Sequence, residues 1–235
     1  RGGPNRSPKP HHVKGLIPML DWNDDSWREP RDNRWTAGCR WLQSWWREIV
    51  LGLEPGPRRP ATPDRLVGSM LPIDAGANAN FLSPEAADAA DQLLSRPNGS
   101  GIVEADRLRR NLLASQPACV NLFGAFVGTP GGLTRWVRSI DPDCAEVTEV
   151  LLEHAPPRDE HFGGGSAFDA FIDYATPTGR RFLGIETKYS ENLRASNISV
   201  RDVYREFTVA SSDWLDGAER RLDVPMLRQF WLTHC

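Results

Sequence analysis

The stretch AFDAFIDYATPTGRRFLGIETKY, residues 167–189, decides the fold because it reads as two strands joined by a tight turn. Residues 167–175 and 181–189 each have the period-two side-chain pattern of a β-strand, which predicts two strands. Residues 176–179, Thr-Pro-Thr-Gly, supply the turn between them, since proline suits the second position of a type I turn and glycine the fourth. The stretch therefore predicts an antiparallel hairpin.

Three charged residues meet on one face of this predicted hairpin. A hairpin closed about the turn places Asp169 directly opposite Glu186, and Lys188 projects from the same face as both. Two neighbouring carboxylates repel each other, and a hard divalent cation relieves that repulsion. Mg²⁺ (or Mn²⁺) suits the pair, because Mg²⁺ is bound by one or two carboxylates and leaves its other positions to water and substrate phosphate.

A lysine beside such an ion orients the attacking water or stabilises the charge that builds on a phosphate. The trio therefore indicates phosphodiester hydrolysis, with Asp169, Glu186 and Lys188 as the candidate catalytic residues. Gly184 lies on the same face and is expected to leave room beside Glu186. The competing interpretation is a solvated cross-strand ion-pair cluster, which stabilises a protein by at most about 1 kcal/mol.

At these residues the chain resembles the PD-(D/E)XK nuclease superfamily, which has the restriction-endonuclease-like fold. Asp169 matches the first carboxylate of the family motif, Glu186 the second and Lys188 the lysine. The flanking sequence resembles a nuclease-like branch of bacterial proteins in four segments, namely 76–85, 107–116 with 121–124, 166–171 and 184–191. The resemblance covers residues 38–235, and its most specific part is the hairpin.

The resemblance implies an α/β fold with an α-β-β-β-α-β core, in which helices flank a mixed central β-sheet and an N-terminal helical extension precedes it. It also implies a metal-dependent nuclease acting on DNA, with the metal held by Asp169, Glu186 and the backbone carbonyl of Thr187. Phe168 replaces the proline of the motif, and no convincing strand follows Lys188. Relatives often add an acidic residue from the first core helix, where Glu104 and Asp106 are not secure matches.

Two further polar residues are candidates for supporting roles. Glu191 lies just past the lysine and either extends the site or caps the segment that follows. Gln116 is polar within an apolar helical stretch, where it either bonds across the helix or contacts the site. Several arginines are candidate phosphate contacts, although each is also a plausible surface charge: Arg107, Arg109, Arg110, Arg135, Arg138, Arg180 and Arg181.

The rest of the chain is organised around this hairpin. Residues 1–35 are expected to be disordered or draped on the surface, with tryptophans as anchors, and residues 36–235 to form a single nuclease-like domain that is truncated at its C-terminus. The remaining elements are predicted from the spacing of apolar residues and from capping and turn residues. In the first half of the chain these are a helix capped by Thr36 and stopped by Gly52, a linker or loop at 54–65, and a helix from Pro84 to Leu94 capped by Ser83. They are followed by helices at 104–113 and 119–126 divided by Pro117, a strand at 146–154, and helices after Ser199.

Composition excludes several classes of protein. With 28 Lys and Arg against 31 Asp and Glu, the formal net charge is −3, which argues against a basic protein that coats nucleic acid nonspecifically. The four cysteines are scattered singly, which is typical of a reduced, cytoplasmic protein. No apolar run is long enough for a membrane span. We therefore expect a cytoplasmic, bacterial nuclease that binds DNA; the alternative is a catalytically inactive nuclease-fold module that binds DNA or a partner protein.

Overall fold

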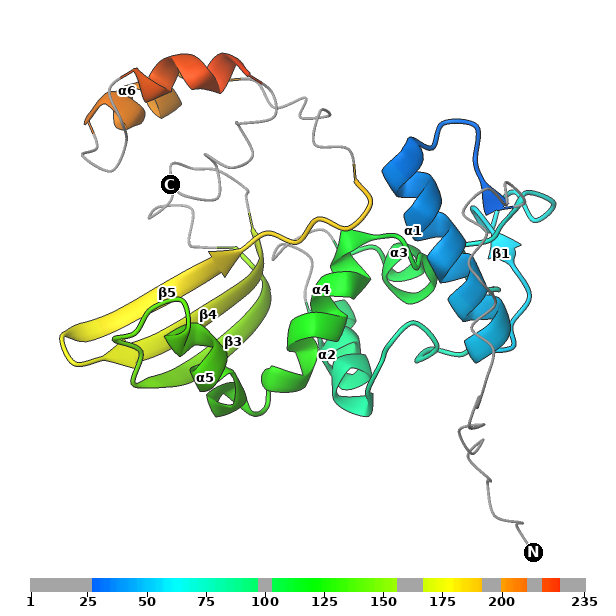
Figure 1. Cartoon of the computed structure of the whole chain (residues 1–235), viewed down its shortest axis with the longest axis horizontal. Helices are drawn as coiled ribbons and strands as arrows, with labels where there is room; N and C mark the ends of the chain where they lie inside the picture. Colours follow the sequence, from blue (N-terminus) through cyan, green and yellow to red (C-terminus); the bar gives the residue numbers. More distant parts are fainter. Residues whose placement is uncertain (1–26, 97–102, 156–166, 192–199, 211–216, 225–235) are drawn as a thin grey trace, which may run out of the picture.

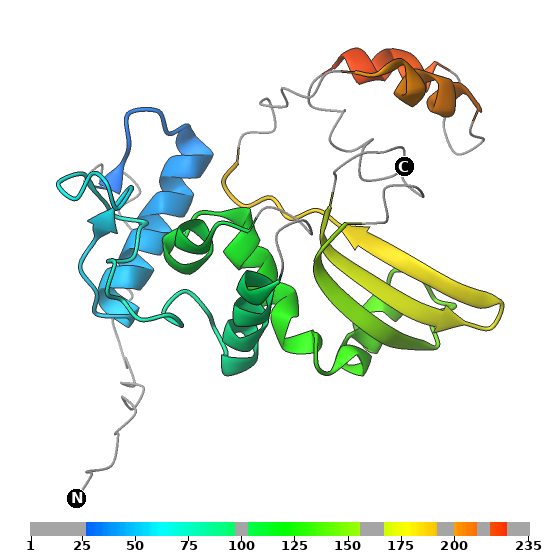
Figure 2. The same cartoon turned by 180° about the vertical axis from the view of Figure 1, so that it is seen from behind.

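The structure is a computed structural model that describes residues 27–96, 103–155, 167–191, 200–210 and 217–224. A three-stranded sheet forms one end of the molecule, and a group of helices stands beside it (Figure 1). Helix α1 and the short β1–β2 ribbon lie at the opposite end, next to α3 (Figures 1 and 2). The chain therefore has the α/β architecture with an N-terminal helix that the sequence predicts. The helices and strands are α1 (Arg34–Trp45), η2 (Trp46–Val50), β1 (Gly56–Pro57), β2 (Leu66–Val67), α2 (Pro84–Ser95), α3 (Ala105–Arg110), α4 (Ser115–Phe123), η3 (Gly124–Phe126), η4 (Pro130–Leu133), α5 (Thr134–Arg138), β3 (Glu146–His154), β4 (Phe168–Thr176), β5 (Gly179–Ile185), α6 (Asp202–Ala210) and η5 (Ala218–Asp223).

The sheet runs in the order β3-β4-β5, and both of its pairings are antiparallel. Strand β3 has the bounds that the sequence predicts. The β4–β5 hairpin pairs Ala170 with Ile185 at one end and Thr176 with Gly179 at the other, so the predicted register is confirmed. Gly179 adopts a φ of +142° at the turn, a backbone conformation that glycine reaches without steric cost.

One face of the sheet carries the core. Every second residue of β4, from Phe168 to Tyr174, is buried, as the period of a strand requires. Two apolar clusters lie against this face, one contributed by α2, α3 and α4 and the other by η4 and α5. Ala170 and Leu152 belong to the first cluster and Ile172 and Val150 to the second, so the two clusters share the same strands.

Strand β5 ends earlier than predicted. It stops at Ile185 rather than continuing to Tyr189. The reason is that the N–H of Thr187 donates to the Asp169 carboxylate, with 2.6 Å between the nitrogen and Oδ2, instead of to a backbone carbonyl of β4. The motif residues that follow Ile185 therefore lie in an irregular segment held by side chains.

The N-terminal helix also begins earlier than predicted. Its N-cap is Asn33, whose Oδ1 accepts from the N–H of Thr36 at 2.9 Å, so the prediction that Thr36 is the cap was wrong. Asparagine is among the best N-cap residues because its short side chain reaches this donor. The helix continues as the π-helical turn η2 and ends before Gly52, which has a φ of +65°.

The segment expected to be a linker or loop at 54–65 is a loop, because a small antiparallel ribbon holds together the residues on either side of 58–65. Strand β1 pairs with β2, Gly56 opposite Val67 and Pro57 opposite Leu66. A Cβ at Gly56 would stand 1.9 Å from the carbonyl oxygen of Leu71, so only glycine permits this close approach of two backbones. The ribbon is thereby fixed against the chain that leads to α2.

The bounds of helices α2, α3 and α4 agree only in part with those predicted from the sequence. Ser83 caps α2 and Pro84 occupies its first turn, as predicted. Helix α3 is shorter than predicted, because Asn111 leaves the helix to bridge Met70. Pro117 lies in the first turn of α4, where a helix tolerates proline, so it does not divide that helix.

Helix α6 and η5 form a separate small unit. Tyr204 and Leu222 are its buried apolar residues, with Val203 and Phe207 packed around them. In Figure 1 this unit lies apart from the sheet. No strand occurs among the described residues that follow Lys188. The first 26 residues lie outside the described part of the chain.

Candidate functional site

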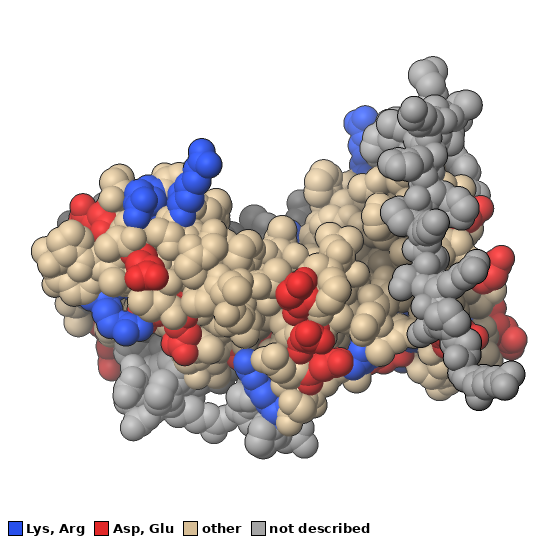
Figure 3. All heavy atoms as spheres, turned by 90° about the horizontal axis from the view of Figure 1, so that it is seen from below, with Lys and Arg blue, Asp and Glu red and all other residues tan. Residues whose placement is uncertain are grey.

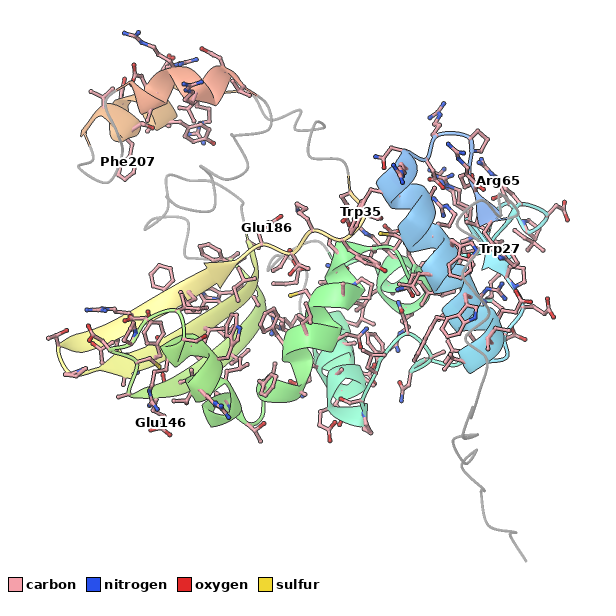
Figure 4. The ribbon with its side chains drawn as sticks, in the orientation of Figure 1. Trp27, Trp35, Arg65, Glu146, Glu186 and Phe207 are labelled. Atoms are coloured by element: carbon pink, nitrogen blue, oxygen red, sulfur yellow. The ribbon has the colours of Figure 1, made fainter. Side chains whose placement is uncertain are left out.

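The candidate site lies where the β4–β5 hairpin meets helix α4. Asp169 is the second residue of β4, and Glu186 directly follows the last residue of β5. Figure 4 shows Glu186 at the end of the yellow strand, beside the helices. Since Ala170 pairs with Ile185, Asp169 and Glu186 occupy the next pair of positions along the hairpin. The structure therefore brings together the two carboxylates that the sequence singles out.

The ionisation of Asp169 is disfavoured by its surroundings. Burial and, after it, the negative charge of Glu186 raise the pKa of Asp169 from its ordinary value of 3.8 to about 6. The N–H of Thr187 and the ammonium of Lys188 oppose this rise without cancelling it. An additional positive charge would therefore be favourable beside Asp169.

Lys188 lies within the site. Its Nζ forms an ion pair with Oε1 of Glu186, and both side chains are partly buried. The lysine also acts on the pKa of Asp169. All three residues of the predicted trio are thus close to one another.

Sequence reasoning missed a further carboxylate, Glu153. It lies near the end of β3, between the pairs Leu152–Ala170 and His154–Phe168, and so stands across from Asp169. Burial raises the pKa of Glu153, and Glu186 adds to the rise. Gln116 on α4 donates from Nε2 to Oε1 of Glu153 at 2.7 Å. The predicted strand at 146–154 already carried this signal, because it places an acidic residue at the end of the neighbouring strand.

Glu153 also has a distinctive backbone. Its φ of +49° is the only positive value of a non-glycine residue in the described part of the chain. The left-handed conformation costs an ordinary L-residue roughly 1–2 kcal/mol. The Glu153 side chain contacts α4 through its hydrogen bond with Gln116.

Neither acidic residue expected from the first core helix joins this group. Asp106 forms an ion pair with Arg110 at 2.6 Å, and Glu104 is exposed at the start of α3. The carboxylates that act on Asp169 are instead Glu186 and Glu153.

Cys119 of α4 closes the buried side of the site. Burial, with a smaller contribution from the nearby carboxylates of Asp169, Glu153 and Glu186, raises the pKa of its thiol to about 12, against a hydrogen bond with the Thr187 side chain. The thiol is therefore neutral at physiological pH and packs as an apolar wall.

The donor set consists of oxygens. Within the residues that the structure describes, no three His, Cys, Asp or Glu side chains are arranged to hold one metal ion together. The available donors are the pair Asp169 and Glu186 together with the Thr187 backbone. Two carboxylates that repel each other in a partly buried site match the ligand preference of Mg²⁺, which completes its coordination with water and substrate oxygens.

The segment after Lys188 is fixed by Glu191. Its carboxylate accepts from the N–H of Ser115 at 2.7 Å, of Tyr189 at 3.0 Å and of Ser190 at 3.1 Å. Burial acts to raise the pKa of Glu191, but these N–H groups outweigh it and the pKa is lowered. Glu191 therefore caps the first turn of α4 and ties the segment after Lys188 to it.

Helix α1 holds the same segment from the other side. The indole N–H of Trp35 donates to the carbonyl of Tyr189 at 3.0 Å, and the Thr36 hydroxyl donates to that of Ser190. Gln43 donates to the Tyr189 hydroxyl at 2.7 Å. Figure 4 shows Trp35 at the end of α1 that faces this segment. The backbone after Lys188 is thus clamped between α1 and α4.

The expectation that Gly184 leaves room beside Glu186 was wrong. A Cβ at Gly184 would lie 2.3 Å from a ring atom of Phe168, so the ring occupies that space. Phe168 belongs to an aromatic group that includes Phe171 and Phe182, whose rings stack with centroids 4.9 Å apart. Because Gly184 has no Cβ, it allows the Phe168 ring to pack next to the site.

Most of the arginines considered as phosphate contacts have structural partners. Arg110 is buried and donates to the carbonyl oxygens of Pro57 and Leu71. The side chains of the others pair with Glu191 (Arg107), Asp91 (Arg109), the carbonyls of residues 144 and 145 (Arg138), Asp173 (Arg180) and Asp141 (Arg181), while Arg135 is exposed on α5. On the face drawn in Figure 3, the described basic and acidic side chains are interspersed.

Comparison with known proteins agrees with the site. A family model described as the PD-(D/E)XK nuclease superfamily matches residues 30–235. No curated protein and no solved structure matches the chain significantly. Because the family match covers most of the chain, the protein belongs to the PD-(D/E)XK nuclease superfamily and has its fold. No helix among the described residues is both long and apolar enough to span a membrane.

Proposed function

We propose that this protein is a metal-dependent nuclease that hydrolyses DNA phosphodiester bonds, with Asp169, Glu186 and Lys188 as its catalytic residues. Membership of a nuclease superfamily supports the general activity. The single cysteines favour a reduced, cytoplasmic setting in a bacterial cell.

One observation carries the proposal above the others. The hairpin register holds Asp169 next to Glu186 in a partly buried place, where burial and Glu186 together raise the pKa of Asp169 to about 6. An arrangement that works against ionisation lowers the stability of the fold, unless a bound cation compensates it. Strongly perturbed carboxylates of this kind concentrate at functional sites.

Asp169 and Glu186 would hold the Mg²⁺ or Mn²⁺ ion, and the Thr187 carbonyl would complete the protein's contribution. When bound, the ion supplies an activated water and neutralises charge on the phosphate. The hydrogen bond from the Thr187 N–H fixes the orientation of the Asp169 carboxylate. Asp169 therefore presents its other oxygen in a constant direction.

Lys188 supplies the positive charge that the reaction requires at the phosphate. Its ion pair with Glu186 keeps the ammonium at the site in the absence of substrate. Glu153, held by Gln116, adds a third carboxylate on the side of β3, where it is placed to accept a proton or to bind through water. Glu191 positions the backbone that carries Lys188 and does not contact the reacting atoms.

One observation favours a second candidate, an inactive nuclease-fold module that binds DNA or a partner protein. Glu186 already has a partner in Lys188, and no described group of three acidic side chains forms a metal cluster. In such a module the lysine would replace the metal permanently. Divalent ions would then leave its thermal stability unchanged.

A cleavage assay on the full chain tests both candidates. Supercoiled plasmid, linear duplex and single-stranded DNA are incubated with Mg²⁺, Mn²⁺ or EDTA. We expect metal-dependent cleavage that Glu186→Gln abolishes and that Lys188→Ala slows by about 10²–10³-fold, the effect of losing one preorganised charge-stabilising group. Circular dichroism verifies that both variants remain folded.

A matched control comes from the same strand. Asp173 also faces away from the core of β4, but it is paired with Arg180 at 2.8 Å near the turn. Asp173→Asn should cleave like the wild type, whereas Asp169→Asn should not. Cleavage that survives Glu186→Gln contradicts the assignment, and no cleavage by the wild type with either metal favours the inactive module.

A further inference from the structure

A groove on the described surface begins beside the candidate site. It has a volume of about 790 Å³ and is lined at one end by Ser190 and Glu191, directly after the catalytic segment. Its walls come from α1, the β1–β2 ribbon and α3, which lie next to each other in both Figures 1 and 2. The groove therefore leads away from Lys188 toward the N-terminal part of the fold.

The cations of this groove differ in how firmly they are held. Arg40 donates to both oxygens of Asp32, at 2.6 and 2.9 Å, and is mostly buried, so it is structural. Among the described residues, Arg58 and Arg107 each make a single ion pair, at 3.4 Å, and about half of each side chain is exposed. Exposed pairs of this kind contribute little and exchange readily for another anion.

Arg59 adds a third available cation. It is exposed, lines the groove and forms no side-chain ion pair or hydrogen bond with any described residue. Its neighbour Arg58 lies at the end of strand β1, and the backbone N–H of Arg58 donates to the carbonyl of Arg65. The ribbon thus presents two adjacent arginines on an anchored turn.

Carboxylates in the groove are mostly neutralised. Asp106 pairs with Arg110, and Glu191 is committed to backbone N–H groups and to Arg107. Glu104 is exposed at the rim. Thr36, Ser69 and Asn111 add polar side chains to the lining, which also contains apolar residues. Four arginines line the groove against three carboxylates, so the formal charge of its lining is positive.

We infer that this groove binds the phosphodiester backbone of one nucleic-acid strand next to the bond that is cleaved, with Arg58, Arg59 and Arg107 contacting successive phosphates. The inference rests on the proposed function and names where its substrate lies. Its volume is in the range of sites that enclose small ligands, about 300–1,000 Å³, so it holds a short stretch of one strand and not a whole duplex. Guanidinium groups suit this ligand because they bind phosphate oxygens in pairs.

Binding measured without cleavage tests the groove independently of catalysis. Fluorescence anisotropy in EDTA follows the full chain with a labelled mixed-sequence DNA oligonucleotide, single-stranded in one arm and annealed to its complement in the other. Each phosphate contact contributes about 0.7 for a single strand, or about 0.9 for a duplex, to the slope of log K against log salt concentration. Arg58→Ala and Arg59→Ala should each weaken binding and reduce the slope by that amount.

Three further variants sharpen the test. Arg59→Lys keeps the charge and should keep the slope. Glu104→Gln removes a repelling carboxylate from the same groove and should tighten binding. Arg220→Ala removes an arginine whose side chain is 86 % exposed on η5, outside the groove, and should leave both quantities unchanged.

The outcomes separate this inference from the proposed function. Slopes that fall for both groove variants but not for Arg220→Ala support the groove, and the arm in which they fall identifies the form of nucleic acid. Unchanged slopes in both arms, or no binding by the wild type, overturn it. If binding depends on the groove but the protein does not cleave DNA, the groove inference holds and the nuclease proposal is refuted. If the groove variants cleave DNA as the wild type does, the nuclease proposal holds and the groove inference is refuted.

Discussion

Asp169→Asn should make the metal-free protein more stable at pH 8. A carboxyl whose pKa is raised on folding binds its proton more tightly in the folded state than in the unfolded state. Its contribution is therefore most favourable below about pH 4 and is lost as the pH rises from 3.8 to about 6. A difference of about two pKa units corresponds to about 3 kcal/mol, at 1.36 kcal/mol per unit, for a group that is largely buried.

Asparagine removes this cost because it is neutral at every pH. Its side-chain oxygen can still accept from the N–H of Thr187, so the local geometry is retained. We expect Asp169→Asn to exceed the wild type in free energy of unfolding by 2–3 kcal/mol at pH 8, roughly the full cost of ionisation. At pH 4 the two proteins should be nearly equal.

Urea denaturation in EDTA at pH 4, 6 and 8 measures the difference. Asp173→Asn is the control, because it removes a carboxylate that pairs favourably with Arg180 and should not stabilise the protein at pH 8. A stabilisation by Asp169→Asn that is absent at pH 8, or equally large at pH 4, would refute the reasoning. Adding Mg²⁺ at pH 8 should stabilise the wild type and not Asp169→Asn.

Three other substitutions have defined expectations, each measured by urea denaturation at pH 7. Ser83→Ala removes the side chain that accepts from the N–H of Ala86 at 3.2 Å and should cost about 1 kcal/mol; an unchanged midpoint would show that the cap contributes nothing. Gly184→Ala drives a methyl group into the Phe168 ring and should cost about 1–3 kcal/mol, a loss that Phe168→Leu in the same chain should partly restore. Glu191→Ala leaves three backbone donors without their acceptor and should cost about 2 kcal/mol, whereas Glu191→Gln should cost less.

The sequence was sufficient to predict the hairpin and its register. Alternation of side chains and the chemistry of a four-residue turn are local signals, and together they place Asp169 opposite Glu186 without any long-range information. The bounds of β3 and the cap of α2 were predicted for the same reason. The prediction that residues 36–235 form one domain remains a prediction.

Features that depend on distant parts of the chain were not predicted. Alternation alone extends β5 to Tyr189, but the Asp169 carboxylate takes the N–H of Thr187 and the strand ends. The left-handed backbone of Glu153 has no local signal, because glutamate rarely adopts it. The roles of Glu191 and Gln116 depend on the position of α4 beside the hairpin, which the sequence does not show.

The clamp that α1 and α4 form on the backbone after Lys188 has a consequence for how the protein folds. Trp35 and Tyr189 are 154 residues apart in the chain, as are Thr36 and Ser190. Contacts between residues so far apart in the chain form late, because the conformational entropy of closing a long loop is lost before the contact contributes stabilising free energy. The hairpin can form from its own local signals well before α1 docks. During synthesis, the N-terminal helix leaves the ribosome long before the segment that it will hold. The backbone after Lys188 is therefore among the last parts of the protein to acquire its shape, and the candidate site should be completed after the sheet has already formed.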